Sequence, residues 1–460
     1  MEHTFDAVIV GAGQAGPSLA GRLTQAGWTV ALVERERLGG TCVNNGCTPT
    51  KAMVASAKAA YTARHGIEYG VTGGEAVSVD LKKVKERKDA IVAKSVASLE
   101  RWVKDMKGCT LIYGHARFEA AHRLRVGDDV LRAKHIFLNV GARPRVPSFP
   151  GIDRVPFLTS STILELEALP QHLVVVGGSY VGLEFAQMFR RFGSEVTVVE
   201  RNRTLLGHED VDVCEGVREA LEAEGISFCL SSECIRLEST PEGVVVNVDC
   251  KQDSPEVHGS HALLAVGRQP NTDDLGLENA GLSVDSQGFI EVDDQLRSRV
   301  DGIWALGDCN GRGGFTHASY NDFEIVAANL LDGDPRRVSD RIPCHALFID
   351  PPLAQVGMNE RAVREQGMAA LMGIRPMTKV SRAIEKGETR GFMKVLVDAA
   401  TQQILGATIF GVGGDEAIHC VLTAMYARQP ASLLQRSVHI HPTVAELIPT
   451  VFQELKPLQA

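Results

Sequence analysis

Two cysteines, Cys42 and Cys47, are separated by four residues in the segment GGTCVNNGCTPTK, which covers residues 39–51. The Thr-Pro dipeptide after the second cysteine suits a turn and a first helical position, and the residues that follow it favour a helix. A cysteine at the start of a helix lies near the positive end of the helix dipole, which favours the thiolate over the thiol. Two such thiols can alternate between dithiol and disulfide, so the segment is a candidate redox centre.

Two other interpretations of this pair are structural cysteines and half of a four-cysteine zinc site. The spacing differs from the two-residue spacing that is typical of thioredoxins and zinc knuckles. We see no second close cysteine pair that could complete a zinc site, so we expect a redox pair and no metal site.

Length, composition and charge narrow the class of protein. The 460 residues suffice for several domains, and 44% hydrophobic and 23% charged residues are typical of a globular protein. A net charge of −9 gives no reason to expect nucleic acid or an anionic membrane as partner. Ten scattered cysteines do not indicate a disulfide scaffold. We see no secretion signal and no membrane span, so we expect a cytoplasmic protein.

The amino-terminal segment has the pattern of a dinucleotide-binding unit. An apolar run over residues 5–10 predicts a buried parallel strand, which leads directly into Gly11, Gly13 and Gly16. Glycines at this spacing allow a tight turn and the close approach of a pyrophosphate to the start of the next helix. A second predicted strand ends at Glu34, where a carboxylate can accept hydrogen bonds from ribose hydroxyls.

A second unit of the same kind follows. A predicted strand over residues 172–176 precedes GGSYVG at residues 177–182, and the next strand ends at Glu200. Two such units imply two dinucleotides, one of which could be a bound flavin and the other a visiting nicotinamide. Glu200 favours the free 2′-hydroxyl of NADH, whereas Arg201 and Arg203 could accept the 2′-phosphate of NADPH or lie in a solvated loop.

Changes in pattern divide the chain into four segments. We expect residues 1–150 and 270–338 to form the first dinucleotide-binding domain and residues 151–269 to form the second. In the second part of the first domain, a predicted strand delivers Asp308 at its carboxyl end, where ligands of doubly wound sheets bind. Residues 339–460 read as an α+β domain without a glycine motif.

The segment HPTVAE, at residues 441–446, places an imidazole and a carboxylate five residues apart across a proline. His441 and Glu446 can form a base and the group that orients it. Taken alone, this stretch favours an ordinary loop over a catalytic pair.

In their order along the chain, these motifs resemble those of the pyridine nucleotide–disulfide oxidoreductase family, whose members include glutathione reductase, dihydrolipoamide dehydrogenase and mercuric reductase. The resemblance extends from about Phe5 to the carboxyl terminus. It implies an α/β fold with two Rossmann-like domains, for FAD and NAD(P), and a C-terminal α+β dimerisation domain. The most specific parts are GGTCVNNGCTPTK at residues 39–51, GGSYVGLE at 177–184, ALGD at 305–308 and HPTVAE at 441–446.

The resemblance also implies how the site acts. Electrons would pass from NAD(P)H through FAD to the Cys42–Cys47 disulfide and then to a disulfide substrate. Cys47 would be the charge-transfer thiol nearer the flavin, and Cys42 the interchange thiol that attacks the substrate. His441, supported by Glu446, would be the acid/base that activates Cys42. In this family that histidine comes from the other subunit, which implies a homodimer with shared active sites.

Further residues are implied to contact the cofactors. Lys51 and Glu184 would pair near the flavin N5, and Tyr180 would cover the flavin ring until nicotinamide displaces it. The residues expected to hold FAD or NAD(P) are Gly11, Gly13, Gly16, Glu34, Gly40, Thr41, Lys51, Ala116, Gly141, Gly177, Ser179, Tyr180, Gly182, Glu200, Gly267, Asp308 and Thr316.

The substrate stays open. A disulfide, either a small molecule or one tethered to a protein such as a lipoyl group, is favoured, and a soft metal such as Hg(II) or Cu(II) could use the same thiols. A non-catalytic binding subunit is disfavoured because Cys42, Cys47 and His441 are all present. Mercuric reductases usually lack this histidine and carry a second cysteine pair near the carboxyl end and a metal-binding domain at the start, neither of which we expect here, since the last cysteine is Cys420.

Overall fold

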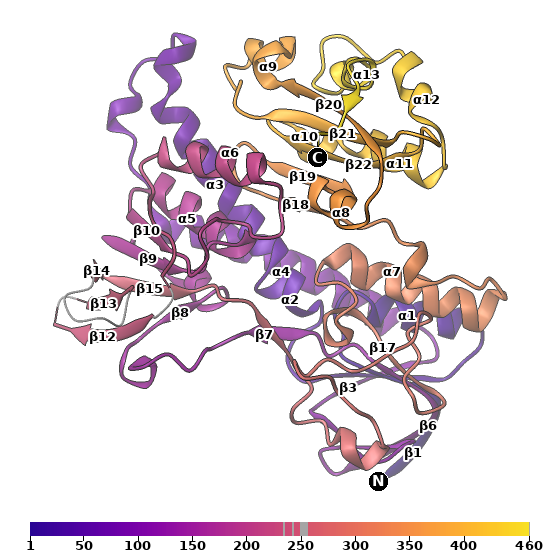
Figure 1. Cartoon of the computed structure of the whole chain (residues 1–460). Coiled ribbons are helices and arrows are strands. Elements are labelled where there is room, and N and C mark those ends of the chain that lie inside the picture. Colours follow the sequence, from indigo (N-terminus) through magenta and orange to yellow (C-terminus); the bar gives the residue numbers. More distant parts are fainter. Residues whose placement is uncertain (233–234, 242, 249–255, 460) are drawn as a thin grey trace.

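A computed structural model describes residues 1–232, 235–241, 243–248 and 256–459 (Figure 1). In this part of the chain the strands form sheets of seven, five, three, two and six strands. In Figure 1 the seven-stranded sheet lies at the lower right, the five-stranded sheet at the left and the six-stranded sheet at the top. The predicted class, two dinucleotide-binding α/β units followed by an α+β domain, is confirmed. The proposed limits of the domains stay predictions.

The seven-stranded sheet combines two distant parts of the chain. Parallel strands lie in the order β3-β2-β1-β6, and β17 pairs with β6, so a strand that ends at Ala305 completes a sheet begun at the amino terminus. Helices α1 (Gly16–Gln25) and α7 (Thr316–Ala327) pack over it and share a buried apolar core with its strands. The strands are β1 (Glu2–Val10), β2 (Val30–Glu34), β3 (Cys109–Tyr113), β4 (Ala116–Ala120), β5 (Arg123–Val126), β6 (Asp129–Leu138) and β17 (Ile303–Ala305).

The five-stranded sheet is parallel throughout, in the order β11-β10-β9-β15-β8. A meander of β12, β13 and β14 covers one part of it, and the short pair β7 and β16 links it to the first sheet. The strand predicted over residues 243–249 is β13, and Asp249 lies outside the described residues. The elements are β7 (Ala142–Pro144), β8 (Leu158–Thr159), β9 (His172–Val176), α5 (Tyr180–Phe192), β10 (Glu195–Val199), α6 (Val211–Glu222), β11 (Ser227–Cys229), β12 (Arg236–Thr240), β13 (Gly243–Asn247), β14 (Glu256–Gly259), β15 (His261–Leu264) and β16 (Arg268–Pro270).

The C-terminal domain is built on a six-stranded antiparallel sheet in the order β18-β19-β22-β21-β20-β23. Its short helices pack on the apolar faces of this sheet and enclose a core of their own. The elements are β18 (Cys344–Leu347), β19 (Leu353–Gly357), α8 (Glu360–Glu365), β20 (Ala370–Pro376), α9 (Ser381–Glu385), β21 (Phe392–Asp398), β22 (Ile404–Phe410), α10 (Gly414–Ala417), α11 (His419–Tyr426), α12 (Ala431–Arg436), α13 (Ile448–Gln453) and β23 (Lys456–Pro457).

Two helices carry the cysteine segment, and two more support it. Cys42 lies in the short helix α2 (Gly40–Asn44), and Cys47 is the first residue of α3 (Cys47–Arg64). Helix α3 packs against α4 (Leu81–Asp105) and α5, so it joins the cysteines to the second dinucleotide unit. The predicted helix therefore starts earlier than Pro49, because the backbone N–H of Thr50 already bonds to the carbonyl of Gly46. Among the described residues, no helix is long and apolar enough to cross a membrane.

Candidate functional site

The two glycine turns have the same construction. Gly11 and Gly177 adopt φ values of 102° and 115°, in the region that favours glycine. A Cβ atom at either position would lie 2.2 or 2.4 Å from a carbonyl oxygen of the facing segment. Gly16 and Gly182 each pack onto the carbonyl of the first glycine, where a Cβ would approach to 2.2 and 2.0 Å. The close packing that a dinucleotide turn requires is therefore present twice.

The acids at the ends of β2 and β10 are also equivalent. Glu34 accepts the N–H of Ala12 at 2.9 Å, and Glu200 accepts the N–H of Gly178 at 2.7 Å. The second oxygen of each carboxylate accepts the N–H of the residue two positions further on, at 2.8 Å in both units. These bonds fix both buried carboxylates beside the glycine turns. A carboxylate offers about four lone-pair positions, so each retains capacity for a ribose hydroxyl.

Four further residues predicted to bind the cofactors lie at turns or in a strand. Gly40, with φ of 58°, brings the start of α2 onto that turn, since a Cβ there would lie 2.8 Å from Cα of Gly13. Gly141 and Gly267 have positive φ, and no atom lies within 4 Å of their missing Cβ positions. Ala116 is buried in β4, so only its backbone could meet a ligand.

Asp308 follows β17, as the sequence predicts, and lies next to Arg268. Burial raises the pKa of Asp308, and the Arg268 guanidinium, whose Nε is 3.5 Å from Oδ2, opposes that effect. Arg268 also reaches the hydroxyl of Thr41 at 3.4 Å. A glycine turn without side chains, the buried acceptor Glu34 and a carboxylate held against an arginine together fit the pyrophosphate, ribose and polyol parts of FAD.

The two cysteines lie together, with unequal proton affinities. The pKa of Cys47 falls to about 6, chiefly because the Cys42 thiol donates a hydrogen bond to its sulfur. The hydroxyl of Thr316, 3.2 Å from that sulfur, and the charge of Lys51 lower it further, against the effect of burial. The pKa of Cys42 is raised by the same thiol–thiol bond and by burial. In the reduced pair, Cys47 is the thiolate and Cys42 holds the proton.

Lys51 and Glu184 form the predicted ion pair, with Nζ 2.5 Å from Oε2. The other carboxylate oxygen of Glu184 accepts the backbone N–H of Phe348 at 2.9 Å, and Nζ of Lys51 lies 4.6 Å from the centre of the Phe348 ring. Lys51 and Glu184 come from α3 and α5, and Phe348 follows β18. This pair thus joins the cysteine helix to both of the other domains.

His441 and Glu446 form a pair of their own. The imidazole Nδ1 lies 2.9 Å from Oε1 and 3.0 Å from Oε2 of the carboxylate, and this contact raises the pKa of His441 and lowers that of Glu446. Within the described residues, no hydrogen bond or ion pair links either side chain to Cys42 or Cys47. Figure 1 shows the C-terminal segment, in yellow, apart from α2. Within one described chain, the His441–Glu446 pair is therefore not joined to the cysteine pair.

Sequence reasoning missed several residues that shape the site. Asn139 accepts the N–H of Gly16 at 3.1 Å and donates to the carbonyl of Leu306 at 3.1 Å, which ties the first glycine turn to β17. Its position at the end of a buried strand was the available signal. Phe348, described above, and His345, described below, carried no signal, because each sits in an unremarkable strand segment.

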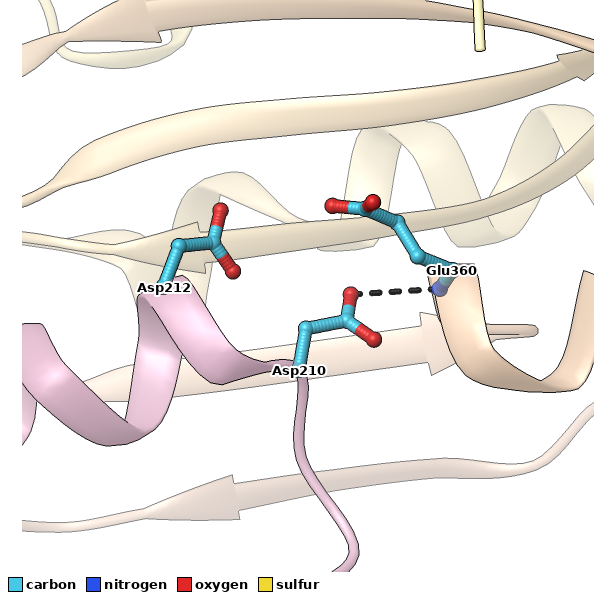
Figure 2. Close-up of side chains that lie close together, drawn as sticks. All are labelled: Asp210, Asp212 and Glu360. Carbon is cyan, nitrogen blue, oxygen red and sulfur yellow. Dashed lines mark hydrogen bonds between the residues drawn. The ribbon is translucent and has the colours of Figure 1, made fainter. Parts of the chain in front are cut away.

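A separate acidic cluster lies between α6 and α8. Asp210, Asp212 and Glu360 point toward one another, and the backbone N–H of Glu360 bonds to Asp210 at 3.1 Å (Figure 2). The buried ammonium of Lys394 lies 2.7 to 2.8 Å from an oxygen of all three carboxylates. The three carboxylates thus already share a buried cationic partner, which ties the second dinucleotide unit to the C-terminal domain.

One more cysteine pair has the spacing of the redox pair. Cys229 and Cys234 are also separated by four residues, which the sequence interpretation overlooked. Cys229 ends β11, and burial raises its pKa, which disfavours the thiolate that binds metals. Cys234 lies outside the described residues.

Comparisons with known proteins cover nearly the whole chain. Residues 5–322 match the family described as pyridine nucleotide-disulphide oxidoreductase, and residues 344–452 match its dimerisation domain. The chain is 36% identical over 470 residues to RclA of Escherichia coli, named a probable pyridine nucleotide-disulfide oxidoreductase, covering 99% of this chain and 100% of RclA. It is 34% identical to dihydrolipoyl dehydrogenase of Staphylococcus aureus, with 96% and 94% covered, and 31% identical to mercuric reductase of Streptomyces lividans, with 97% and 95% covered.

A comparison with solved structures indicates the same family. The fold is similar, with a TM-score of 0.89 and 35% identity over 98% of this chain and 99% of the other, to a Cu(II) complex of RclA from Escherichia coli, described as an HOCl-induced flavoprotein disulfide reductase. The two glycine turns, the cysteine pair and the C-terminal domain lie within the matched regions. The chain therefore belongs to the pyridine nucleotide-disulfide oxidoreductase family, as an FAD-dependent enzyme with a C-terminal dimerisation domain.

Proposed function

We propose that this enzyme reduces disulfides through Cys42 and Cys47, with NADH as the preferred electron donor. The unequal proton affinities of the two thiols carry this proposal, because a thiolate at Cys47 and a thiol at Cys42 divide the work between them. FAD, when bound, supplies the two-electron carrier that connects a nicotinamide with sulfur. Glu34, Asp308 and the first glycine turn would hold it.

The thiol chemistry uses residues of this chain. His441 takes the proton of Cys42, whose raised pKa makes a base necessary, and the Cys42 thiolate attacks one sulfur of the substrate disulfide. The other substrate sulfur leaves as a thiolate and takes that proton from His441. The Cys47 thiolate then attacks Cys42, which releases the second substrate thiolate and leaves a Cys42–Cys47 disulfide.

The base is proposed to come from a second copy of the chain. The side chain of His441 is 69% exposed, and its neighbours Val438 and Ile440 are 98% and 79% exposed. Apolar side chains with this exposure beside a histidine fit a surface that a partner subunit covers. A homodimer would bring His441 and Glu446 of one subunit to the cysteines of the other.

NADH is proposed over NADPH because Glu200 is fixed beside the second turn. A 2′-phosphate at the position of a ribose hydroxyl would face this carboxylate, whereas a hydroxyl could donate to it. Arg201 and Arg203 are exposed and make no ion pair among the described residues. A cytoplasmic location is proposed as well, since the eight cysteines in the described part of the chain are free thiols.

A soft metal ion is the second candidate substrate. The similar protein RclA was solved as a Cu(II) complex, and mercuric reductase is another similar protein. Thiolates are the ligands that soft metal ions prefer, so the same cysteine pair could receive such an ion.

Anaerobic reduction of the FAD-loaded protein by NADH or NADPH, followed by a panel of disulfides, Cu(II) and Hg(II), tests the proposal. We expect NADH to reduce the enzyme and at least one disulfide to reoxidise it. In the Cys42→Ser and Cys47→Ser variants, the disulfide should no longer reoxidise the enzyme. Reoxidation by metal ions alone would replace the disulfide by a metal as substrate. A protein that takes up no FAD, or that neither coenzyme reduces, would contradict the proposed function.

A further inference from the structure

Three polar side chains from three separate elements meet at the second dinucleotide unit. Tyr180, the first residue of α5, donates its hydroxyl to Oε1 of Glu209 at 2.6 Å. Nε2 of His345, in β18, lies 2.8 Å from the same carboxylate oxygen and 3.1 Å from the tyrosine hydroxyl. Glu209 lies just before α6, in the loop that follows β10. The carboxylate thus holds a tyrosine of the second unit and a histidine of the C-terminal domain at one oxygen.

The carboxylate of Glu209 is almost fully enclosed. Its side chain is 2% exposed, and its second oxygen, Oε2, is buried without a hydrogen-bond partner. Burial acts to raise its pKa, but the contacts from His345 and Tyr180 outweigh burial and hold it below the usual range. Burial and the negative charge of Glu209 raise the pKa of Tyr180, so the tyrosine remains a proton donor. Removal of either donor would leave a buried charge with a single partner.

The position of the network connects the coenzyme turn with the redox centre. Tyr180 directly follows Ser179 in the second glycine turn, and its ring meets the edge of Phe315 at 6.3 Å. Phe315 stacks on His345 at 5.8 Å and precedes Thr316, whose hydroxyl contacts Cys47. The tyrosine ring therefore stands between the turn expected to bind the nicotinamide coenzyme and the segment that touches the thiolate.

We propose that Glu209 and His345 form a latch that holds Tyr180 over the coenzyme path and sets how readily a pyridine dinucleotide displaces it. This inference rests on the proposed function and on the role that the family resemblance implies for Tyr180, which would move to admit nicotinamide. Glu209 and His345 are positioning residues, which act through Tyr180. The free-energy cost of moving Tyr180 depends on which hydrogen bonds the Glu209 carboxylate loses and which it keeps.

The two positioning residues have opposite effects. Glu209 holds the tyrosine with a charge-assisted bond, which is about twice as strong as a neutral one. His345 stays hydrogen-bonded to the carboxylate after Tyr180 leaves, so the carboxylate still has a donor. Moving Tyr180 away therefore costs less free energy than it would if the tyrosine were the only donor. Loss of the charge at Glu209 loosens the latch, and loss of the donor at His345 tightens it. Because the apparent dissociation constant scales inversely with the open fraction, the two changes shift coenzyme affinity in opposite directions.

Four variants of the FAD-loaded enzyme test the latch, with NAD⁺ as probe in calorimetric titrations, or NADP⁺ if NADPH proves the better donor. Glu209→Gln keeps the shape and removes the charge, and Tyr180→Phe removes only the hydroxyl. His345→Phe keeps a ring against Phe315 without the donor, and His345→Gln restores a donor. Expected Kd values are lower by about threefold to thirtyfold in the first two variants and higher by a similar factor in His345→Phe. His345→Gln is expected within about twofold of the wild type.

Reoxidation of the reduced enzyme by a disulfide is the second readout, and it should be unchanged in Glu209→Gln, His345→Phe and His345→Gln, because the latch acts on coenzyme entry alone. Kd values that are unchanged, or that move in the same direction in Glu209→Gln and His345→Phe, would overturn the latch and leave the network a purely structural one. If Glu209→Gln does not fold, Tyr180→Phe, which removes a single oxygen, still tests whether loss of this hydrogen bond raises coenzyme affinity. A wild-type enzyme that no coenzyme reduces would instead contradict the proposed function itself, and the latch with it.

Discussion

The sulfur of Cys47 and the hydroxyl oxygen of Thr316 lie 3.2 Å apart, although 269 positions of sequence separate them. This hydroxyl is one of the groups that lower the pKa of Cys47 to about 6. Thr316→Val keeps the shape of the side chain and removes the donor, so the pKa of Cys47 should rise. Titration of thiolate absorbance in the reduced enzyme measures the change, and Thr316→Ser, which keeps a hydroxyl, should stay near the wild type. Equal pKa values in both variants would mean that the contact does not act on the thiolate.

The division of roles between the cysteines can be read from a spectrum. Cys42→Ser leaves Cys47 as a lone thiolate, which should produce a long-wavelength charge-transfer band with oxidised flavin. Because the pKa of Cys47 is lowered, the band should persist down to about pH 6 and fade as the pH falls below that value. Cys42→Ala removes the main donor to the sulfur, so its band should fade at a higher pH. A band in Cys47→Ser instead of Cys42→Ser would reverse the assignment.

The fold could be predicted from the sequence where local signals were strong. Strands β9 and β10 cover the predicted residues 172–176 and 195–199, because short apolar runs between turns leave little choice of register. Helix α2 was not predicted. It starts after Gly39 and at Gly40, both of which adopt positive φ values that the sequence does not disclose. The start of α3 was placed too late, because the carbonyl of Gly46 already accepts the N–H of Thr50, a contact that the Thr-Pro dipeptide does not disclose.

The site was predicted less completely than the fold. Local motifs identified the cysteines and the acids at the ends of β2 and β10, because each sits beside a recognisable turn or helix, whereas the Lys51–Glu184 pair followed from the family resemblance. The contact of Glu209 with His345 spans 136 positions, and that of Phe348 with Glu184 spans 164. Such contacts form only when one domain packs on another, so no local sequence pattern predicts them. The spacing of His441 and Glu446 allowed a base and the group that orients it, but only the family resemblance favoured that role over an ordinary loop.

Coenzyme preference should follow the carboxylate of Glu200. We expect a higher kcat/KM with NADH than with NADPH, because a 2′-phosphate would face a buried negative charge. Glu200→Ser removes that charge and should shift the ratio toward NADPH by roughly tenfold or more, equivalent to about 1.4 kcal/mol. As a control, replacing Arg201 and Arg203 together by alanine should lower activity with NADPH and leave NADH unaffected. A wild-type enzyme that prefers NADPH would show that the arginines outweigh the carboxylate.

The free energy of unfolding should depend on Lys394, the lysine that contacts the three acidic side chains drawn in Figure 2. Lys394 is 1% exposed, and Lys394→Met would leave Asp210, Asp212 and Glu360 without their buried counter-ion. Breaking a buried ionic cluster from one side costs about 3–5 kcal/mol, measurable by urea unfolding. The exposed Lys82→Met is the matched control and should change stability by no more than about 0.5 kcal/mol.

The exposed pair of His441 and Glu446 makes the most demanding prediction, because the base must be separable from coenzyme oxidation. His441→Ala should still bind FAD and be reduced by NADH at the wild-type rate, while disulfide reduction slows by about 10²–10⁴-fold. Glu446→Gln should show a smaller defect, and its pH profile should move to lower pH, since the carboxylate raises the pKa of His441. Wild-type turnover in His441→Ala on every disulfide would remove the imidazole from the mechanism and favour a metal substrate.

Complementation between two inactive variants decides whether the base acts across a subunit interface. Cys42→Ser and His441→Ala are each expected to be inactive as homodimers. In a mixed dimer, the His441→Ala subunit keeps both cysteines and receives the imidazole of the Cys42→Ser subunit, so one of the two sites is complete. Mixing under conditions of confirmed subunit exchange should therefore restore activity, with up to half of the wild-type value in each mixed dimer. Exchange without any recovery would place the base and the thiols within one chain, contrary to the separation of His441 from Cys42 in the single subunit.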